Sequence, residues 1–367
     1  MILSPNTTPA LVKRIYEISA RAKQLKTLLP IATKIVDYEL NELMYQVRIA
    51  VAGYLKTSNL EKEIEKEQEA EEKHVKIPKQ EEAPLTQDPF RPIDTTLEVT
   101  SVEPYHTMLL NKFMVIPEHL LIITKEFKPQ TEHLTMDDFK SVVTTLKQLH
   151  EGNQDADDYI CFYNRGLYSG ASQPHKHIQL IPRRERNEAT LEWTPIENFP
   201  LPRQFDIHVS KYPSTVTDFK DFSFLHQIRS IKHCFEFSDD AAIVKALFEV
   251  YVSMLKELDM YEDRVVKDSE ERVLKIQCNA GEIYEISLCP KRYPSYNLLF
   301  SKKWMVLVPR RNENYMGISC NSLAFLHGFF AKTDAHWEHL KSEVKIPKLL
   351  EYLTFPSHHD HATSANK

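Results

Sequence analysis

The sequence predicts an α/β (α+β) protein in which short buried strands alternate with amphipathic helices. Apolar runs of strand length recur along the chain, and longer stretches carry apolar residues at helical spacing. A hydrophobic share of 42% and a charged share of 27% are ordinary for a chain that buries a core. The 367 residues include only seven glycines, which disfavours propellers and folds built on many tight hairpin turns.

The N-terminal part is expected to be helical and then to form a strand. We assign the first forty residues to helix, with Thr7 or Thr8 as the N-cap. A strand is predicted at 45–52. Residues 59–87 are acidic and begin with alternating glutamate and lysine, which predicts a solvated helix that frays into a flexible insert.

The remaining elements follow from periodicity and capping signals. Thr135 and Asp138 have the spacing of a helix N-cap pair, and the apolar stripe behind them reaches Leu149. Further helices are expected at 241–258 and 337–353. Strands are predicted at 108–115, 119–124, 159–163, 175–181, 273–279, 283–289, 296–300 and 305–308.

The length suggests about two domains, or one large domain with insertions. We divide the chain into five regions. These are the N-terminal helices and first strand at 1–58, the acidic insert at 59–87, one half at 88–200, a second half at 201–355, and a disordered tail at 356–367 that holds a histidine-rich stretch.

Charge and cysteine content limit the function classes. The chain has 46 basic and 52 acidic residues, a net charge of -6, which disfavours a nucleic-acid partner. It lacks an apolar run of the roughly 18–20 residues that a membrane span requires. Five cysteines without a C-x-x-C pair suit a reducing compartment. We therefore expect no membrane partner and a cytoplasmic location, with the nucleus as the alternative, and a monomer rather than an oligomer.

The chemistry is expected around the predicted strand at 175–181. Side chains alternate faces along a strand, so His175, His177 and Gln179 should point the same way. Polar groups on one buried face are costly without partners, which favours a site that uses them over a pair of buried structural histidines. The preceding loop, with Gly170, could present backbone N–H groups to an anion.

A histidine on such a strand can act as a nucleophile. A neutral imidazole attacks phosphorus and forms a covalent phosphoramidate, which divides one difficult displacement into two easier ones. Its other ring nitrogen must then donate to an acceptor, and a backbone carbonyl or a ring two residues away would serve. A zinc site built on His175 and His177 is the competing interpretation. It lacks a nearby cysteine and a third ligand at a telling spacing, so no protein metal site is predicted.

The run Gly-Ala-Ser-Gln-Pro-His-Lys-His-Ile-Gln at 170–179 resembles the H-x-H-x-Q motif of the nucleotidyltransferase branch of the histidine-triad superfamily. More closely, it is similar to the fungal-type diadenosine tetraphosphate phosphorylases, also called ATP adenylyltransferases. The resemblance covers about residues 40 to 335 without the acidic insert. Other matching segments are Asp88-Pro89-Phe90, Leu110-Asn111-Lys112-Phe113, Asn164-Arg165-Gly166, Tyr296-Asn297-Leu298-Leu299, Val308-Pro309-Arg310 and Asn321-Ser322-Leu323.

The resemblance implies a histidine-triad-like fold with a central antiparallel sheet flanked by helices. The catalytic half would be 88–200, and 201–355 would be the ATP adenylyltransferase-like half. It also implies phosphorolysis of diadenosine tetraphosphate by inorganic phosphate to ATP and ADP. His177 would take AMP from the α-phosphorus, His175 would orient it, and Gln179 would hold a non-bridging oxygen of the intermediate. Glutamine cannot act as a general base, which fits transfer to phosphate rather than to water.

Further residues match nucleotide contacts of the family, and Mg²⁺ is expected with the tetraphosphate because the substrate needs charge neutralisation. The chain departs from the family after Leu323, where 324–328 is bulkier than the usual glycine-rich stretch. The implied nucleotide and phosphate contacts are Lys56, Asn111, Lys112, Asn164, Gly170, Ala171, Ser172, Gln173, Asn321, Ser322, Leu323 and Lys332.

Two alternatives remain open. A nucleotidylyltransferase or phosphorylase acting on a GDP- or UDP-hexose would share the strand, although the hexose-1-phosphate uridylyltransferases normally have proline where this chain has Lys176. A non-catalytic nucleotide-binding scaffold would share the strand as well. If the loop contacts phosphate, Gly170→Val should damage catalysis more than stability.

Overall fold

The structure is a computed structural model that describes residues 9–40, 43–51, 88–151, 157–212, 219, 221–258, 260, 273–277, 283–287, 295–341 and 345–357. The predicted caps Thr7 and Thr8, the site residue Lys56, the acidic insert and the histidine-rich stretch of the tail lie outside these residues. No helix in the described part of the chain has the length and apolar character needed to cross a membrane.

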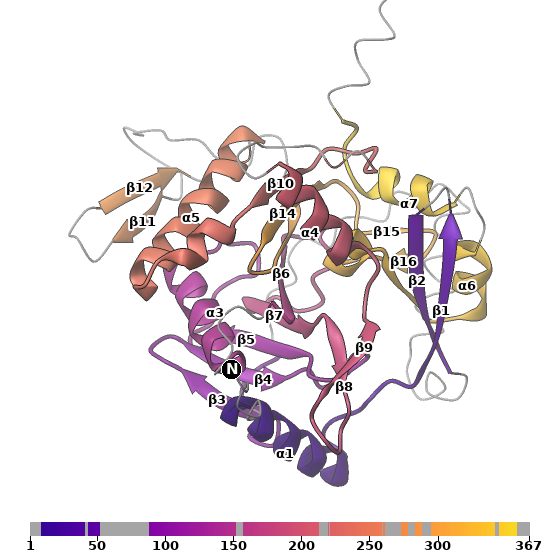
Figure 1. The fold of residues 1–367 in the computed structure, drawn as a ribbon, viewed down its shortest axis with the longest axis horizontal. Helices are drawn as coiled ribbons and strands as arrows, with labels where there is room; N and C mark the ends of the chain where they lie inside the picture. Colours follow the sequence, from indigo (N-terminus) through magenta and orange to yellow (C-terminus); the bar gives the residue numbers. More distant parts are fainter. Residues whose placement is uncertain are drawn as a thin grey trace, which may run out of the picture.

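An eight-stranded sheet forms the centre of the molecule, and every neighbouring pair in it is antiparallel (Figure 1). The predicted central antiparallel sheet is therefore confirmed. Both halves contribute strands, because β6 of the first half pairs with β13 of the second. In spatial order the strands are β10 (Gln227–Ser230), β14 (Trp304–Arg310), β13 (Ser295–Phe300), β6 (Tyr159–Arg165), β7 (His177–Pro182), β5 (Leu120–Thr124), β4 (His106–Leu110) and β3 (Glu98–Val102).

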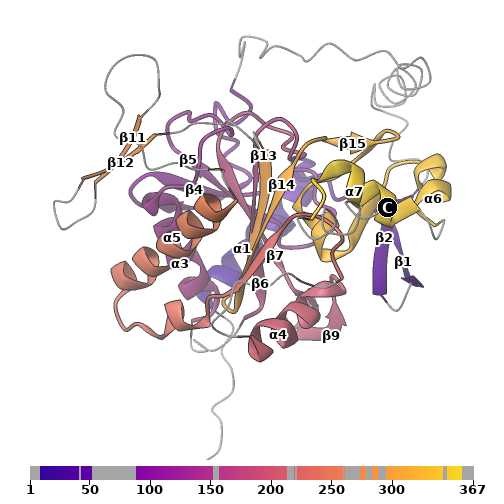
Figure 2. The ribbon, with the colours of Figure 1, turned by 90° about the horizontal axis from the view of Figure 1, so that it is seen from above.

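Helices flank this sheet, as the sequence predicts. One face packs against α1 (Ala10–Leu25), α3 (Met136–Leu149) and α5 (Asp240–Glu257) through a large apolar cluster. The other face is covered by a second cluster that includes residues of α4 (Leu201–Lys211) and the C-terminal helices. Figure 2 shows α3 and α5 on one side of the sheet, with α6, α7 and the β1–β2 pair on the other. The capping box at Thr135 and Asp138 is confirmed at the start of α3.

A smaller sheet joins the two ends of the chain. It consists of β1 (Thr33–Leu40), β2 (Leu43–Ala50) and β17 (Gly328–Ala331), with β17 parallel to β2. The assignment of the first forty residues to helix is thus wrong beyond Leu25. Ile35, Val36 and Tyr38 favour a strand, and β2 supplies the backbone partners because the two strands are neighbours in sequence, with Leu40 opposite Leu43.

Three other expectations are corrected. The strand predicted at 108–115 ends at Leu110, and the closing helix is divided into α6 (Asp334–Leu340) and α7 (Lys345–Leu353). Pro347 explains the division, because it lacks an N–H to donate to the preceding turn and therefore suits the first turn of a new helix. The tail predicted to be disordered from 356 begins with an ordered residue, since Pro356 forms a β-bridge with Phe224.

Short elements complete the fold and were mostly not predicted. Only the β11–β12 pair matches predicted strands, at 273–279 and 283–289. The short elements are β8 (Arg184–Arg186), β9 (Trp193–Glu197), η2 (Lys232–Glu236), β11 (Val273–Gln277), β12 (Ile283–Ser287), β15 (Asn314–Tyr315), β16 (Ile318–Ser319) and η3 (Ser322–Leu326).

Candidate active site

His177 opens strand β7 with its ring in the state that nucleophilic attack requires. Its Nδ1 lies 2.8 Å from the carbonyl oxygen of His175, to which Nδ1–H donates. The side chain is buried, and burial lowers the pKa of His177 to about 4. The ring is therefore neutral at physiological pH, and Nε2 carries the free lone pair.

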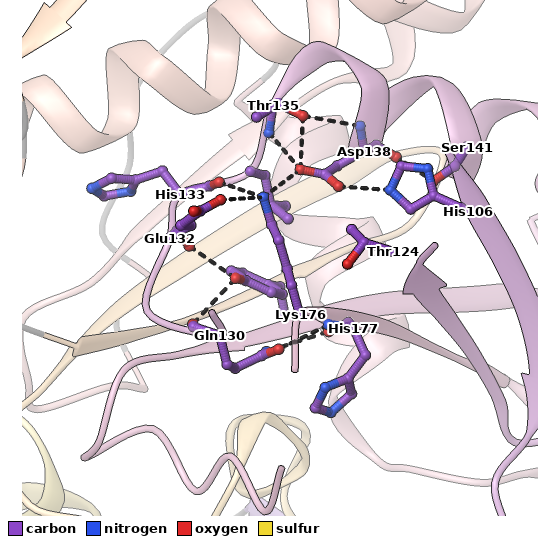
Figure 3. Close-up of polar contacts among 12 residues, drawn as sticks. His106, Thr124, Gln130, Glu132, His133, Thr135, Asp138, Ser141, Lys176 and His177 are labelled. Atoms are coloured by element: carbon purple, nitrogen blue, oxygen red, sulfur yellow. Dashed lines mark hydrogen bonds and ion pairs between the residues drawn. The ribbon is translucent and has the colours of Figure 1, made fainter. Parts of the chain in front are cut away.

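The backbone of His177 is held by a side chain rather than by a strand on that side. Pairing between β6 and β7 ends at Phe162 and Gln179, so His177 lies beyond the last paired residues. Gln130 fills the gap: its Oε1 accepts the His177 N–H at 2.8 Å, and its Nε2 donates to the carbonyl oxygens of Asn164 at 2.8 Å and His177 at 3.3 Å (Figure 3). Gln130 was missed because a loop glutamine has no recognisable sequence signal.

His175 lies just before β7 and has a different environment from His177. Its Nδ1 is 2.8 Å from Asp88 Oδ1, and its Nε2 is 2.9 Å from both the hydroxyl and the carbonyl oxygen of Thr124. The ring is fully buried and these contacts occupy both nitrogens. His175 thus supports His177 through its backbone carbonyl, not through its ring.

Lys176 points away from the site, into the other side of the sheet. Its ammonium donates to Asp138 Oδ2 and to the carbonyl oxygen of His133, both at 2.7 Å, and Asp138 Oδ1 is 2.8 Å from His106 Nε2. Figure 3 shows Lys176 directed toward the N-terminal end of α3 while the ring of His177 points the opposite way. The Lys176 ammonium and His106 hold the pKa of Asp138 well below its usual range despite burial. Lys176 therefore anchors the histidine strand to α3.

Gln179 shares the face of β7 with His177 and contacts His119, a histidine outside the predicted site. Gln179 Oε1 lies 2.9 Å from His119 Nε2, and His119 Nδ1 lies 3.2 Å from Asn111 Nδ2. The register explains the contact, since Leu121 is directly opposite Gln179 and His119 is its diagonal neighbour. The sequence signal that could have identified His119 is its position as a polar residue at the start of the otherwise apolar strand predicted at 119–124.

Two cavities meet beside this cluster. The His177 cavity, of about 240 Å³, is lined by His177, Lys112 and Gln173 and by the 89–97 segment. The Lys332 cavity, of about 270 Å³, is lined by Lys332, Arg48 and His119 and by the walls that the second half supplies. Residues that border both cavities are Asn111, Phe113, Ser172 and Gln179.

The loop before the histidines contributes to both cavities, but Gly170 has an additional structural role. Its φ is +73°, and a Cβ there would lie 2.4 Å from the carbonyl oxygen of Cys320. Gly170 lines the Lys332 cavity, so a substitution would damage both packing and the site. The expectation that Gly170→Val damages catalysis more than stability stays a prediction, to which the structure adds a packing cost against Cys320. Ala171 is partly buried and is not among the residues that line either cavity.

Asn164 is a connector between the two halves rather than a wall of a cavity. Its Oδ1 accepts from Asn297 Nδ2 at 2.8 Å and from the Ser322 hydroxyl at 2.6 Å and N–H at 3.1 Å. Arg310 extends the network by donating to Asn297 Oδ1 and, at 3.0 Å, to the carbonyl oxygen of Cys320. Asn164 and Ser322 are both buried, and neither is among the residues that line these two cavities, so their contact with a nucleotide stays a prediction.

The second-half segment places Asn321 and Leu323 at the wall of the Lys332 cavity. The bulky stretch after Leu323 forms η3, where Phe325 and Leu326 are buried in the core. Gly328 follows, and a Cβ at this position would lie 2.4 Å from the ring of Phe199. The departure from the family pattern therefore combines core packing by Phe325 and Leu326 with lining of the Lys332 cavity by Ala324 and Gly328.

Basic side chains serve both cavities. Lys112 lines one cavity and Lys332 the other, while Lys56 lies outside the described residues, and the role of these lysines as phosphate contacts stays a prediction. Arg48 was missed, although it lines the Lys332 cavity and its guanidinium donates to Asn198 Oδ1 at 3.0 Å. No group of three His, Cys, Asp or Glu side chains in the described residues is placed to hold a metal ion, so the geometry gives the zinc interpretation no support there.

Comparison with known proteins identifies the family. The Ap4A phosphorylase N-terminal domain model matches residues 3–200, and the ATP adenylyltransferase C-terminal domain model matches residues 220–356. Diadenosine 5',5'''-P1,P4-tetraphosphate phosphorylase 2 of Saccharomyces cerevisiae is 30% identical over 283 residues, which are 74% of this chain and 77% of that protein.

Solved structures show the same fold. The crystal structure of yeast Ap4A phosphorylase Apa2 matches with a TM-score of 0.64 and 23% identity, over 95% of this chain and 98% of that one. The structure of Apa2 in complex with Ap4A matches with the same TM-score, at 22% identity and with the same coverage of both chains. With the two domain models and the 30% identical relative, the resemblance inferred from the sequence is confirmed: this chain belongs to the Ap4A phosphorylase and ATP adenylyltransferase family of nucleotidyltransferases.

Proposed function

We propose that this protein cleaves diadenosine tetraphosphate with inorganic phosphate, giving ATP and ADP through an adenylylated His177. The observation that carries the proposal is the state of His177. Its Nδ1–H is committed to the His175 carbonyl, its ring is neutral, and it lines a cavity that Gln179 and Ser172 also border. The family relationship supports the same reaction class.

The reaction proceeds in two displacements. Nε2 of His177 attacks the α-phosphorus of one adenylyl group, an N–P bond forms, and the P–O bond to the remaining three phosphates breaks, so ATP leaves. A phosphate oxygen then attacks the same phosphorus, the N–P bond breaks, and ADP is released. Gln179 contributes a neutral amide near the transferred group and cannot remove a proton from water, which favours phosphate as the acceptor.

The two cavities suit the two ends of a dinucleotide. They meet at Gln179 and Ser172, so a polyphosphate lying across this junction would direct one nucleoside into each cavity. Lys112, Lys332 and Arg48 would offset the charge of the phosphates. Mg²⁺ would be carried by the tetraphosphate, where it would neutralise further charge. We infer action as a cytoplasmic monomer, without a nucleic-acid or membrane partner.

Trapping the intermediate tests this proposal. Incubation with diadenosine tetraphosphate labelled in the adenosine, without phosphate, should leave about one AMP on each protein chain, and added phosphate should release it as ADP. His177→Ala should abolish labelling, whereas the buried and distant His150→Phe should retain it. Retained labelling of His177→Ala would contradict the assigned nucleophile.

The remaining candidates differ in their products. Formation of AMP and ATP in phosphate buffer would indicate a hydrolase. Faster turnover of GDP- or UDP-hexoses than of diadenosine tetraphosphate would indicate a nucleotide-sugar enzyme. An unlabelled wild-type protein that still binds the dinucleotide would indicate a scaffold.

A further inference from the structure

His119 is a buried histidine that lies between two residues bordering both cavities. It is 8% exposed, and its ring nitrogens contact Gln179 on one side and Asn111 on the other. Its ring also packs against Phe162, with centroids 6.0 Å apart. Burial lowers the pKa of His119 to about 4, so the ring is neutral and one nitrogen must donate while the other accepts.

The direction of this hydrogen-bond chain is set by a backbone group. The N–H of Phe113, which can only donate, lies 3.1 Å from Asn111 Oδ1. Asn111 therefore presents its NH₂ group to His119, and Nδ1 of His119 must accept. In a neutral ring the proton is then on Nε2, which donates to Gln179, so Gln179 must present its oxygen to His119.

We propose that His119 is a positioning residue that fixes the Gln179 amide with its NH₂ group available to a phosphoryl oxygen. This inference rests on the proposed function, because it assigns a role in the adenylyl transfer at His177. Without His119, the Gln179 amide could rotate and present its carbonyl oxygen, which would repel a phosphoryl oxygen. The predicted polarity is Phe113 N–H to Asn111, Asn111 to His119, His119 to Gln179, and Gln179 to substrate.

The backbone at His119 is itself held firmly. The preceding residue, Glu118, has a φ of +58°, a left-handed conformation that costs about 1 kcal/mol or more for a residue other than glycine. Its carboxylate accepts from Tyr16 Oη at 2.7 Å and Tyr159 Oη at 2.6 Å, and Arg186 Nε lies 3.2 Å from it. Three elements therefore hold the turn that leads into His119.

A tautomer measurement tests the polarity without reference to catalysis. Long-range ¹H–¹⁵N spectra of the full-length protein at pH 7 should show one histidine, absent in His119→Gln, protonated on Nε2 with an unprotonated Nδ1. Protonation on Nδ1, or a charged ring, would overturn the proposal. The result is informative even if the protein does not transfer AMP.

Kinetics test whether His119 acts through Gln179. In His119→Phe, which keeps a packed ring, the single-turnover rate of AMP transfer should fall about 10- to 100-fold, with KM changed less than about 3-fold. His119→Gln, which restores a donor at the Nε2 position, should recover the rate to within about 3-fold of wild type. Failure of His119→Gln to recover in a folded protein would overturn the proposal.

A double-mutant cycle separates positioning from general destabilisation. Gln179→Ala and His119→Phe/Gln179→Ala should have rates within about 2-fold of each other, because His119 has no further effect once its target is absent. Multiplicative losses would overturn the proposal. His150→Phe is the matched control, because His150 is a buried histidine at the C-cap of α3 whose loss should lower stability without changing the rate. An unlabelled wild-type protein would instead refute the proposed function, which the tautomer measurement does not depend on.

Discussion

The side-chain amide of Gln130 accepts the backbone N–H of His177 at 2.8 Å and donates to its carbonyl oxygen at 3.3 Å. A loop side chain thus takes the place of a neighbouring strand, since the β6–β7 pairing has already ended at Gln179. His177 therefore keeps extended-strand geometry while its ring stays accessible from the cavity side.

Gln130→Ala should lower the single-turnover AMP-transfer rate at least about 10-fold, because the backbone of the nucleophile loses both partners. The loss of buried hydrogen bonds should also cost about 1–3 kcal/mol in the free energy of unfolding. Gln227→Ala, which removes a buried glutamine from the distant strand β10, serves as the control. Equal rates for the two variants would show that this clamp is unimportant.

Lys176→Met should destabilise the protein by about 3–5 kcal/mol, because it leaves the buried Asp138 carboxylate without its ammonium partner. Urea unfolding measures this change. Adding Asp138→Asn should restore part of the loss, since it removes the uncompensated charge. A loss below about 1 kcal/mol in the single variant would contradict a structural ion pair.

Gly170→Ala should destabilise the protein more than Gly317→Ala. The two glycines have φ values of +73° and +72°, so the conformational cost is similar. Only Gly170 faces a backbone atom, at 2.4 Å from the new Cβ, whereas the nearest atom at Gly317 is 3.6 Å away. Thermal unfolding should show a difference of about 1–3 kcal/mol. Similar melting temperatures would mean that the Cys320 segment moves freely.

The rate of AMP transfer should be nearly constant from pH 8 to pH 5.5. The pKa of His177 is about 4, so Nε2 remains unprotonated across this range. A histidine with an ordinary pKa near 6.5 would be about 90% protonated at pH 5.5 and would lose about tenfold in rate. Single-turnover labelling across this pH range distinguishes the lowered pKa from an ordinary one. A tenfold fall in the labelling rate would contradict a buried neutral ring.

Stability should fall as the pH is lowered from 7 to 5.5. Burial lowers the pKa of His119 and His177 to about 4 and that of His327 to about 3, so the unfolded chain binds more protons than the folded chain between these values and 6.5. Protonation of each of these histidines in the unfolded chain therefore lowers the free energy of unfolding by about 1 kcal/mol between pH 7 and pH 5.5. Urea unfolding of wild type and His327→Phe should differ in pH dependence by this amount.

Residue spacing within short segments predicts those helices and strands whose signals lie within the segment itself. The capping box of α3 and the strands around His177 depend on spacing alone, and they were correct. The β1 strand was misassigned although it pairs with the strand that directly follows it, whereas β2 also pairs with residues near 330. Such long-range pairing leaves no local trace.

The residues of the candidate site are likewise of two kinds, those that a local motif predicts and those that only the tertiary structure brings together. His177 and Gln179 are adjacent in a motif, so the sequence could identify them, and the structure brings both to a cavity. Gln130 and Arg48 reach the site from a loop and from a distant strand, and only the tertiary structure brings them there. Asn164 was identified as a site residue, yet its oxygen is committed to Asn297 and Ser322.

The pairing of β6 with β13 places strands of the two family domains side by side in one sheet, so we expect the two domains to fold together. A fragment ending at residue 200 would leave β6 as a long apolar edge, the kind of surface that recruits other chains. We expect that fragment to aggregate alone and to become soluble when co-expressed with residues 201–367. A chimera that joins one half of this chain to the other half of a relative should then fold poorly. We therefore expect substitutions in the two halves to be matched across the shared sheet during evolution.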